Sequence, residues 1–282
     1  METSTPEFIL ITLKSGFKSL RSLQYNETFH PVTGPLAEAN ILHVKQQRLV
    51  ERASTGKKLI IWDVGFGAAA NVIAAIEALL TLSPLDVEIH SFDRTTAPIE
   101  FALAHSEELG YLAPYESHLK QLLKDKSVLL APGLSWHLHM GDFRSEVKSS
   151  LLHSPHAVIY DPYSPVGNPD MWTEEAFTTL WQRLDPKTPC LLTNYTRSTS
   201  MRVALLLAGF YVGIGSEVGE KAETSVASNC LEMIKRPLDR KWLEARVRIS
   251  HNSAPLKTAL YSKSPITAED YQRLEQHPQF AI

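Results

Sequence analysis

Residues 157–172 read AVIYDPYSPVGNPDMW, and this stretch indicates both the fold and the position of a functional site. Its first four residues form a short apolar run, typical of a parallel strand that is covered on both faces. Pro162 lacks a backbone N–H and ends the strand. Asp161 is therefore expected at the carboxyl end of a central strand, where open α/β sheets bind ligands. Position alone leaves two roles open for this carboxylate: a cap for the next turn, or a catalytic group.

The segments on both sides of this stretch alternate between strand and helix patterns, which predicts a doubly wound, mostly parallel sheet. We expect seven strands, the last two forming a terminal antiparallel pair. The strands are predicted at residues 59–64, 87–93, 135–140, 157–160, 190–195, 210–214 and 224–227. The helices are predicted at residues 36–52, 68–82, 98–109, 115–124, 173–184 and 200–208. After Cys230 the regularity fades into a polar tail.

Length and composition exclude several classes of protein. The 282 residues are 44% hydrophobic and 21% charged, as in a globular protein with a substantial core. The net charge of −3 gives no global basic field, so any contact with nucleic acid has to be local. The two cysteines are far apart, which speaks against a disulfide framework or a zinc site. Without a signal peptide or a long apolar run, we expect a cytoplasmic enzyme that binds no metal and no membrane.

Three consecutive strand ends carry residues suited to a nucleoside ligand. Gly65-Phe66-Gly67 lies between a strand and a helix, where glycines let the backbone approach a ligand closely. Asp93 ends the second strand, where an acid can accept ribose hydroxyls, and Asp142 ends the third. Each signal has a plain structural alternative: a tight strand-to-helix turn for the glycines, and a helix cap for Asp93. The residue three after Gly67 is Ala70, which favours S-adenosyl-L-methionine over a dinucleotide.

This combination resembles the Rossmann-like class I S-adenosyl-L-methionine-dependent methyltransferases. Within them, residues 161–172 resemble the D-x-F-x-P-x-x-N-P-x-x-W block of the MnmC-type tRNA methyltransferases. Weaker matches lie at residues 27–39, 63–71, 193–210 and 219–223. The family converts 5-aminomethyl-2-thiouridine at the tRNA wobble position to its 5-methylaminomethyl form. The resemblance thus implies the cofactor S-adenosyl-L-methionine and a tRNA anticodon loop as partner.

The resemblance also implies roles for individual residues. Asp161 is the catalytic candidate: it would bind the substrate ammonium, orient the amine and accept or relay its proton. We expect the cofactor to be bound by Tyr25, Glu38, Gly65, Phe66, Gly67, Asn71, Asp93, Asp142 and Asp161. The target pocket is expected to comprise Pro162, Tyr163, Ser164 and Tyr195. Trp172 is interpreted as a lid or an anchor in the core and not as a platform for a base.

The implied organisation has three parts. Residues 1–57 would cover the cofactor site with short strands and a helix, residues 58–230 would form the methyltransferase core, and residues 231–282 a polar, basic extension. Residues 235–257 hold seven lysines and arginines against two acids and are a candidate for phosphate contacts. The tRNA contacts predicted there are Lys235, Arg236, Arg240, Lys241, Arg246 and Arg248. A solvated tail is an equally open interpretation of this segment.

Several departures from the family pattern keep other functions open. Asp93 stands where a glutamate is usual, and Tyr195 and Arg197 stand where small residues are common. The flavin-dependent oxidoreductase half of the bifunctional enzymes has no counterpart in 282 residues, so we expect a stand-alone methyltransferase supplied by a separate oxidoreductase. The alternatives are a class I methyltransferase acting on a small amine or a protein, and a non-catalytic relative that only binds S-adenosyl-L-methionine.

Overall fold

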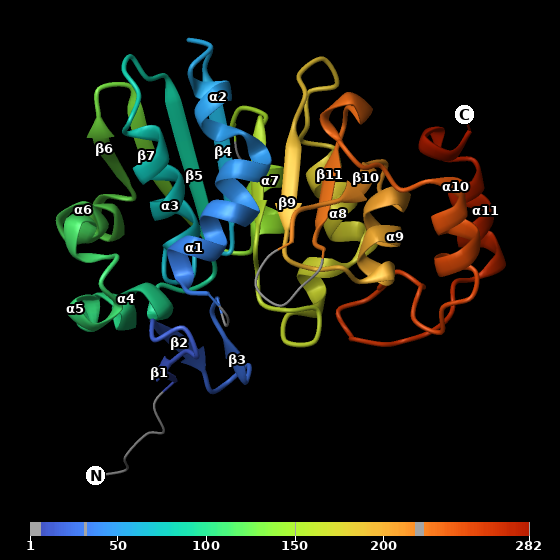
Figure 1. The fold of residues 1–282 in the computed structure, drawn as a ribbon, viewed down its shortest axis with the longest axis horizontal. Helices are drawn as coiled ribbons and strands as arrows, with labels where there is room; N and C mark the ends of the chain where they lie inside the picture. Colours follow the sequence, from blue (N-terminus) through green and yellow to red (C-terminus); the bar gives the residue numbers. More distant parts are fainter. Residues whose placement is uncertain (1–6, 31–32, 150, 218–222, 282) are drawn as a thin grey trace.

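The computed structural model describes residues 7–30, 33–149, 151–217 and 223–281. Its centre is an eight-stranded sheet in the order β10-β11-β9-β8-β4-β5-β7-β6 (Figure 1). The strands are β4 (Leu59–Val64), β5 (Val87–Asp93), β6 (Ser127–Ala131), β7 (Leu134–Met140), β8 (Ala157–Tyr160), β9 (Leu191–Asn194), β10 (Tyr211–Ile214) and β11 (Ser225–Ser228). The five strands from β9 to β7 are mutually parallel, which confirms the predicted mostly parallel sheet. The pair of β10 and β11 is antiparallel, as expected.

The predicted number of seven strands is wrong because β6 adds an antiparallel edge strand beside β7. Its apolar residues follow closely on a helix that ends at Asp125, so the pattern alone does not separate a short strand from a last helical turn. Leu129 of β6 is 66% exposed, as befits an edge strand with little cover.

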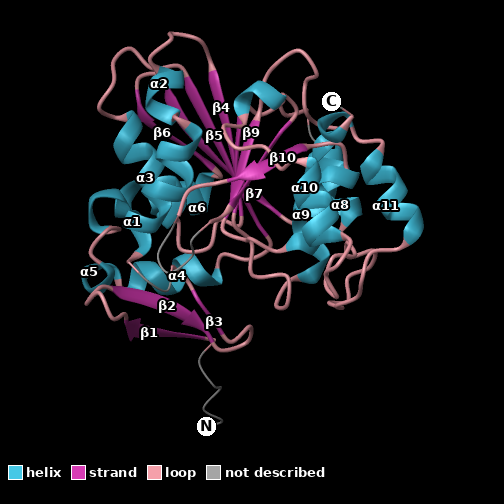
Figure 2. Ribbon diagram, turned by 45° about the vertical axis from the view of Figure 1, so that its right-hand side comes forward, coloured by secondary structure: helices cyan, strands magenta, loops and turns pink. Residues whose placement is uncertain are grey.

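Helices cover the sheet on both faces, as Figure 2 shows with the sheet nearly edge-on. One face carries α1 (Pro35–Ala39), η1 (Asn40–Lys45), α2 (Leu49–Ala53), α3 (Ala70–Leu79), α4 (Ala97–Ala104), α5 (Ser106–Leu109), η2 (Ala113–Tyr115) and α6 (Glu116–Asp125). The other carries α7 (Phe143–Ser149), η3 (Pro169–Trp172), α8 (Glu174–Trp181), α9 (Thr199–Leu207) and α11 (Ala268–Glu275). The helix predicted at 36–52 is interrupted, because η1 is a π-helix and Arg48 adopts a left-handed conformation.

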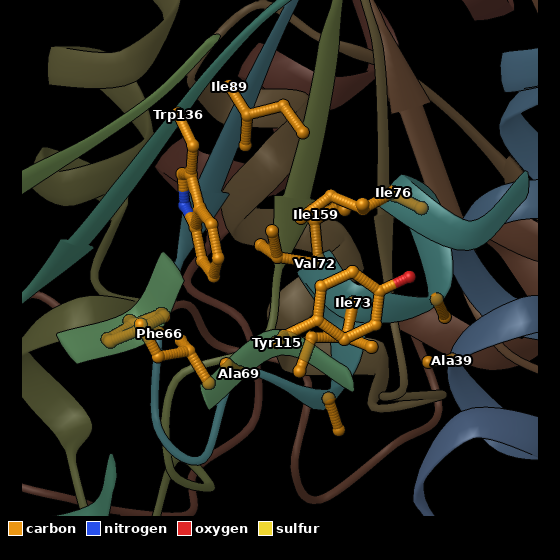
Figure 3. Packing of buried hydrophobic residues seen from close by; sticks show 14 of the residues in the cluster. Ala39, Phe66, Ala69, Val72, Ile73, Ile76, Ile89, Tyr115, Trp136 and Ile159 are labelled. Carbon is orange, nitrogen blue, oxygen red and sulfur yellow. The ribbon is translucent and has the colours of Figure 1, made fainter. Parts of the chain in front are cut away.

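Each face of the sheet has its own hydrophobic core. On the α3 side, Val72, Ile73 and Ile76 of α3 pack toward Ile89 of β5 and Ile159 of β8 (Figure 3). The opposite core contains Trp62, Tyr160 and Trp172, all at most 1% exposed. Trp172 is thus an anchor in the core, as predicted. β5, which ends at Asp93, and β8, which leads into Asp161, are packed against a hydrophobic core on each face. This packing fixes the positions of their carboxyl ends.

A small N-terminal sheet lies below the carboxyl ends of the central strands (Figure 1). It consists of β1 (Phe8–Thr12), β2 (Lys18–Ser22) and β3 (Glu27–Thr28) in antiparallel order. Phe8 is buried and belongs to the core on the α3 side. The N-terminal segment is therefore packed onto the edge of the sheet where the site is predicted.

The C-terminal residues are more ordered than the fading pattern suggested. α10 (Arg240–Trp242), η5 (Leu243–Val247), α11 and η6 (Pro278–Phe280) follow the short η4 (Leu231–Met233), and Leu243, Leu274 and Phe280 are buried in the core. The Gln279 side chain accepts from Val212 N and donates to Val212 O, 2.7 and 2.8 Å away. It thereby occupies part of the free edge of β10. No helix in the described part of the chain is long and apolar enough to cross a membrane.

Candidate active site

A cavity of about 900 Å³ opens at the carboxyl ends of β4, β5, β8 and β9. Its size is in the range of pockets that hold a ligand of cofactor size. Most of the predicted cofactor and target residues line it, namely Glu38, Gly65, Phe66, Gly67, Asn71, Asp93, Asp161, Pro162, Tyr163, Ser164 and Tyr195. Other lining residues are Lys14, Asn26, Glu27, Thr28, Phe29, His30, Leu42, Ala68, Ala70, Pro98, Asn168 and Arg197. The structure thus brings together residues from four strand ends and the N-terminal segment.

The glycine loop leaves β4 through a backbone conformation that needs glycine. Gly65 has a φ of 96°, and a Cβ added there would lie 2.7 Å from the carbonyl oxygen of Asp161. The backbone N–H groups of Gly65 and Phe66 both donate to the carbonyl of Phe92, at 3.0 and 3.2 Å. The loop is therefore held between β5 and the segment after β8, and it approaches both more closely than a side chain would permit.

Asp93 uses its carboxylate to shape the loop as well as the cavity. Its Oδ2 accepts from Gly67 N at 2.9 Å, and its Oδ1 accepts from Arg94 N at 2.7 Å. Burial raises the pKa of Asp93, while these backbone hydrogen bonds oppose the rise. Oδ1 also accepts from Thr95 N at 3.3 Å, whereas Oδ2 has a further lone pair and retains capacity to accept a ribose hydroxyl. The turn-capping interpretation and the cofactor interpretation are compatible at this residue.

Asp161 lies where the loop after β8 meets the first turn of α3. Its backbone N–H donates to Val64 O at 2.9 Å, and its Oδ2 accepts from Asn71 Nδ2 at 2.7 Å. Tyr195, at the end of β9, lines the same cavity. Burial raises the pKa of Tyr195 well above its ordinary value, and the nearby Asp161 and Glu27 raise it further. The phenol is thus neutral beside the carboxylate.

The loop of residues 161–172 is fastened at several points. Ser164 donates through its backbone N–H to Glu27 Oε2 at 2.9 Å, and its hydroxyl donates to Glu27 Oε1. Trp172 Nε1 donates to Tyr163 O at 2.8 Å. The ring of Tyr25 stacks on Tyr163, with centroids 4.1 Å apart. Tyr25, predicted as a cofactor contact, therefore supports the pocket from behind Tyr163 and is outside the set of lining residues.

Asp142, like Tyr25, is a predicted cofactor residue that the structure places differently. It is outside the set of residues lining the cavity. Arg144 Nε donates to Asp142 Oδ1 at 2.9 Å, and Arg94 Nη2 donates to Asp142 Oδ2 at 2.6 Å. Both arginines also contact Asp170. Hydrogen bonds from Arg144 and Arg94 hold the pKa of Asp142 well below its usual range. A contact of Asp142 with the cofactor remains a prediction.

Two features of the site were missed in the sequence. Asp63 in β4 is 1% exposed; its Oδ2 accepts from Ser91 Oγ at 2.8 Å, and burial raises its pKa well above the ordinary value. The sequence signal that could have indicated Asp63 is an acid inside an apolar strand, two residues before Gly65. The hydrogen bonds of Glu27 to Ser164 were also missed, because they join segments 137 residues apart. The quoted segment at 219–223 lies largely outside the described residues.

The predicted tRNA contacts fall into two groups. Lys235 and Arg236 line a second cavity, separate from the one that contains Asp161. Arg240, Lys241, Arg246 and Arg248 are exposed on and beside α10 and η5. Arg240 pairs with Glu244 at 3.6 Å and donates to Phe280 O at 3.2 Å. Among the described residues, no group of three or more His, Cys, Asp or Glu side chains is arranged to hold a metal ion.

Comparisons with known proteins agree with this geometry. Residues 110–229 match a family model described as S-adenosyl-L-methionine-dependent methyltransferase. The chain is 28% identical over 219 residues to the tRNA 5-methylaminomethyl-2-thiouridine biosynthesis bifunctional protein MnmC of Ectopseudomonas mendocina (strain ymp), covering 72% of this chain and 32% of the relative. The MnmC of Ralstonia nicotianae is 27% identical, covering 73% and 32%. The chain thus spans about a third of the length of these curated relatives.

A solved structure resembles nearly the whole chain. The crystal structure of MNMC2 from Aquifex aeolicus superimposes with a TM-score of 0.72 at 26% identity, covering 97% of this chain and 86% of that one. The similarity includes the N-terminal sheet and the C-terminal helices as well as the central sheet, since so little of the chain is left out.

Proposed function

We propose that this chain, an MnmC-like S-adenosyl-L-methionine-dependent methyltransferase with a class I fold, methylates the 5-aminomethyl group of 5-aminomethyl-2-thiouridine at the wobble position of tRNA. The observation that carries the proposal is the position of Asp161. Its carboxylate lines the cavity beside Asn71, in the first turn of α3, and near Tyr195. A group that recognises an amine thus lies next to the place proposed for the methyl donor.

The cavity suits S-adenosyl-L-methionine on three grounds. Its volume of about 900 Å³ is sufficient for a nucleoside with an amino-acid tail. Gly65 and Gly67 contribute backbone without side chains to the wall beside the first turn of α3. Asp93 and Glu38 offer carboxylates that can accept ribose hydroxyls or bind an amino group. We propose the remaining predicted residues, Asn71 and Phe66 among them, as further contacts.

Methyl transfer to an amine requires the protein to bind the ammonium, align the nitrogen and remove a proton. When bound, the cofactor supplies an electrophilic methyl group on a sulfonium: the nitrogen–carbon bond forms, the carbon–sulfur bond breaks, and the sulfur keeps the electron pair. A primary alkylamine has a pKa of about 10 in water, so it arrives mostly protonated. Asp161 binds this ammonium, aligns the nitrogen and takes up or relays the proton that has to leave. Tyr163 and Tyr195 form apolar walls that exclude water from the amine.

The base itself has to leave the anticodon stack to reach this pocket. Wobble uridines are displayed from a single-stranded loop, and proteins read such bases by splaying them out against aromatic side chains. The stacked pair of Tyr25 and Tyr163 at the cavity supplies a rigid aromatic wall for this purpose. We further propose that a flavin-dependent oxidoreductase supplies the 5-aminomethyl substrate, since the MnmC relatives are described as bifunctional and this chain matches about a third of their length.

The experiment is methyl transfer from labelled S-adenosyl-L-methionine to tRNA that carries 5-aminomethyl-2-thiouridine, with wild type and Asp161→Asn. We expect label in the tRNA with the wild type and a loss of roughly a hundredfold or more in turnover with the variant. Cofactor affinity, measured by calorimetry, should stay within a few fold. Transfer by Asp161→Asn at the wild-type rate would remove the role assigned to this carboxylate. Transfer to a small amine or a protein, with none to tRNA, would favour the alternative substrates.

A further inference from the structure

A second cavity, of about 930 Å³, lies on the surface beside the one described above. One wall is formed by η1, α2 and the residues that lead into β4. The opposite wall is formed by residues 187–191 before and within β9, residues 214–216 after β10, and residues 232–236. The proposed methyl transfer does not use this cavity. Of its lining residues, only Lys235 and Arg236 are among the predicted tRNA contacts.

The lining of the second cavity is strongly basic. Eight cations and two acids give it a net charge of +6 in a chain whose total is −3. The cations are Lys45, Arg48, Arg52, Lys57, Lys58, Lys187, Lys235 and Arg236, and the acids are Glu51 and Glu232. The rest of the chain therefore carries a net charge of −9, so the positive potential is concentrated in this cavity. A concave surface with one sign of charge focuses the field on an oppositely charged ligand.

Most of these cations are available for a ligand. Lys45, Arg48, Lys57, Lys187 and Lys235 are exposed and make no ion pair with another described residue. The other three are anchored: Lys58 pairs with Glu88 at 2.7 Å, Arg52 donates to His156 O at 2.7 Å, and Arg236 donates to Gly215 O at 2.6 Å. The cavity thus combines three fixed cations with five mobile ones, on both of its walls.

The two cavities share a wall. Ile41 lines the basic cavity, while Leu42, the next residue of η1, lines the cavity that contains Asp161. Lys45 follows Leu42 by three residues, a rise of about 5 Å along a helix. A strand that places one base in the first cavity would therefore have its neighbouring phosphates within reach of Lys45 and of the residues behind it.

We propose that the second cavity binds the phosphodiester backbone of the tRNA whose wobble base enters the first cavity. The inference rests on the proposed function for the identity of the RNA, and on the charge and adjacency of the cavity for the site itself. Phosphate contacts supply affinity and register without reading sequence, which suits an enzyme that reads the target through the modified base alone. A polymer fits better than a small anion, because the free cations lie on both walls.

The test compares Lys45→Gln/Lys235→Gln, which removes one free cation from each wall, with Lys124→Gln/Lys148→Gln. The control lysines are exposed on α6 and α7, line neither cavity, and change the net charge equally. Binding of unmodified tRNA is measured by fluorescence anisotropy over a range of salt concentrations. We expect the cavity variant to bind about tenfold more weakly at 0.1 M salt. The slope of log K against log salt should fall in magnitude by about 1.4–1.8, the value for two lost phosphate contacts.

Methyl transfer separates this inference from the proposed function. We expect the cavity variant to raise KM for the modified tRNA, with kcat at saturating tRNA and cofactor affinity unchanged. Equal tRNA affinity and equal salt slope for the two double variants would overturn the inference, whatever the outcome for catalysis. If the wild type transferred no methyl group while the cavity variant still lost tRNA affinity, the basic cavity would stand as an RNA site and the proposed reaction would fall.

Discussion

The side-chain amide of Asn71 donates a hydrogen bond of 2.7 Å to Oδ2 of Asp161. Asn71 belongs to the first turn of α3, which follows the glycine loop, and Asp161 is the first residue after β8. The bond therefore couples the wall proposed for the cofactor to the carboxylate proposed for the amine. It fixes one oxygen of Asp161 while the side chain stays at the cavity.

Replacing this amide by a second acid tests the coupling. In Asn71→Asp two carboxylates would face each other at hydrogen-bond distance, and their repulsion raises the pKa at which the pair loses its second proton. Because Asp161 has to be ionised to bind an ammonium, the acidic limb of the kcat/KM profile should move to higher pH. At pH 6 we expect a loss of about tenfold or more, with partial recovery at pH 9. Asn71→Ala, which adds no charge, is the control; a profile shifted equally in both variants would contradict the account.

The glycine loop allows a matched pair of substitutions. Gly65→Ala would place a Cβ 2.7 Å from Asp161 O and 2.9 Å from Pro162 Cα, at a φ of 96°. Gly56→Ala has a φ of 71° with nothing within 4 Å of the added Cβ, so it carries backbone strain alone, about 1–3 kcal/mol at most. We expect Gly65→Ala to lower the melting temperature further than Gly56→Ala and to lose cofactor binding. Calorimetry that finds equal cofactor affinity in the two variants would show that the loop does not form the cofactor wall.

Glu27 is expected to hold the N-terminal sheet over the cavity. It accepts two hydrogen bonds from Ser164, one of them from the backbone. Glu27→Ala leaves that half-buried N–H without its acceptor and frees the loop, so we expect the Kd of S-adenosyl-L-methionine to rise about tenfold. Glu27→Gln keeps an amide oxygen and should recover part of the affinity. Glu7→Ala, an exposed acid just before β1, is the control. If Glu7→Ala bound S-adenosyl-L-methionine as weakly as Glu27→Ala, the loss of affinity would come from a disturbance of the whole N-terminal sheet and not from the bonds between Glu27 and Ser164.

His43 predicts a loss of stability in mild acid. The side chain is fully buried, its Nδ1 is 2.8 Å from Thr193 Oγ1, and its Nε2 has no partner in the described part of the chain. Burial lowers its pKa to about 3. In the unfolded chain this histidine binds a proton below about pH 6.5, whereas in the folded protein it stays neutral down to about pH 3. The free energy of unfolding therefore decreases as the pH is lowered across this window.

The contribution of His43 between pH 6.5 and pH 5 is about 2 kcal/mol. Urea unfolding at the two pH values measures it. We expect His43→Gln to be less stable at pH 7 but to lose less on acidification than the wild type, whereas exposed His251→Gln should follow the wild type. Parallel losses in wild type and His43→Gln would mean that the histidine is protonated in the folded protein.

Three central strands were predictable because β4 and β8 are mostly apolar runs that lead into a glycine or an acid, and β5 ends in an acid. Gly65, Asp93 and Asp161 follow from that rule, and the structure brings them to one cavity. The edge strand β6 was not, since an exposed leucine and a preceding helix blur its pattern. The contact between Glu27 and Ser164 depends on tertiary structure and leaves no local signal.

The basic cavity was even harder to predict from the sequence. Its cations are spread from residue 45 to residue 236, so no window of the sequence reveals them as a group. The contiguous basic segment at residues 235–257 is split instead by the fold: Lys235 and Arg236 enter the cavity, and Arg240 turns toward Glu244 and Phe280. Charge runs along the chain are a weak guide to charge on the surface.

The most direct measurement of the central claim is the identity of the wobble nucleoside after reaction. tRNA bearing 5-aminomethyl-2-thiouridine is incubated with the protein and S-adenosyl-L-methionine, digested to nucleosides, and analysed by mass spectrometry. We predict conversion to 5-methylaminomethyl-2-thiouridine, with all other nucleosides unchanged and with little or no conversion by Asp161→Asn. An unmodified wobble nucleoside, from wild-type protein that binds both the cofactor and the tRNA, would contradict the account.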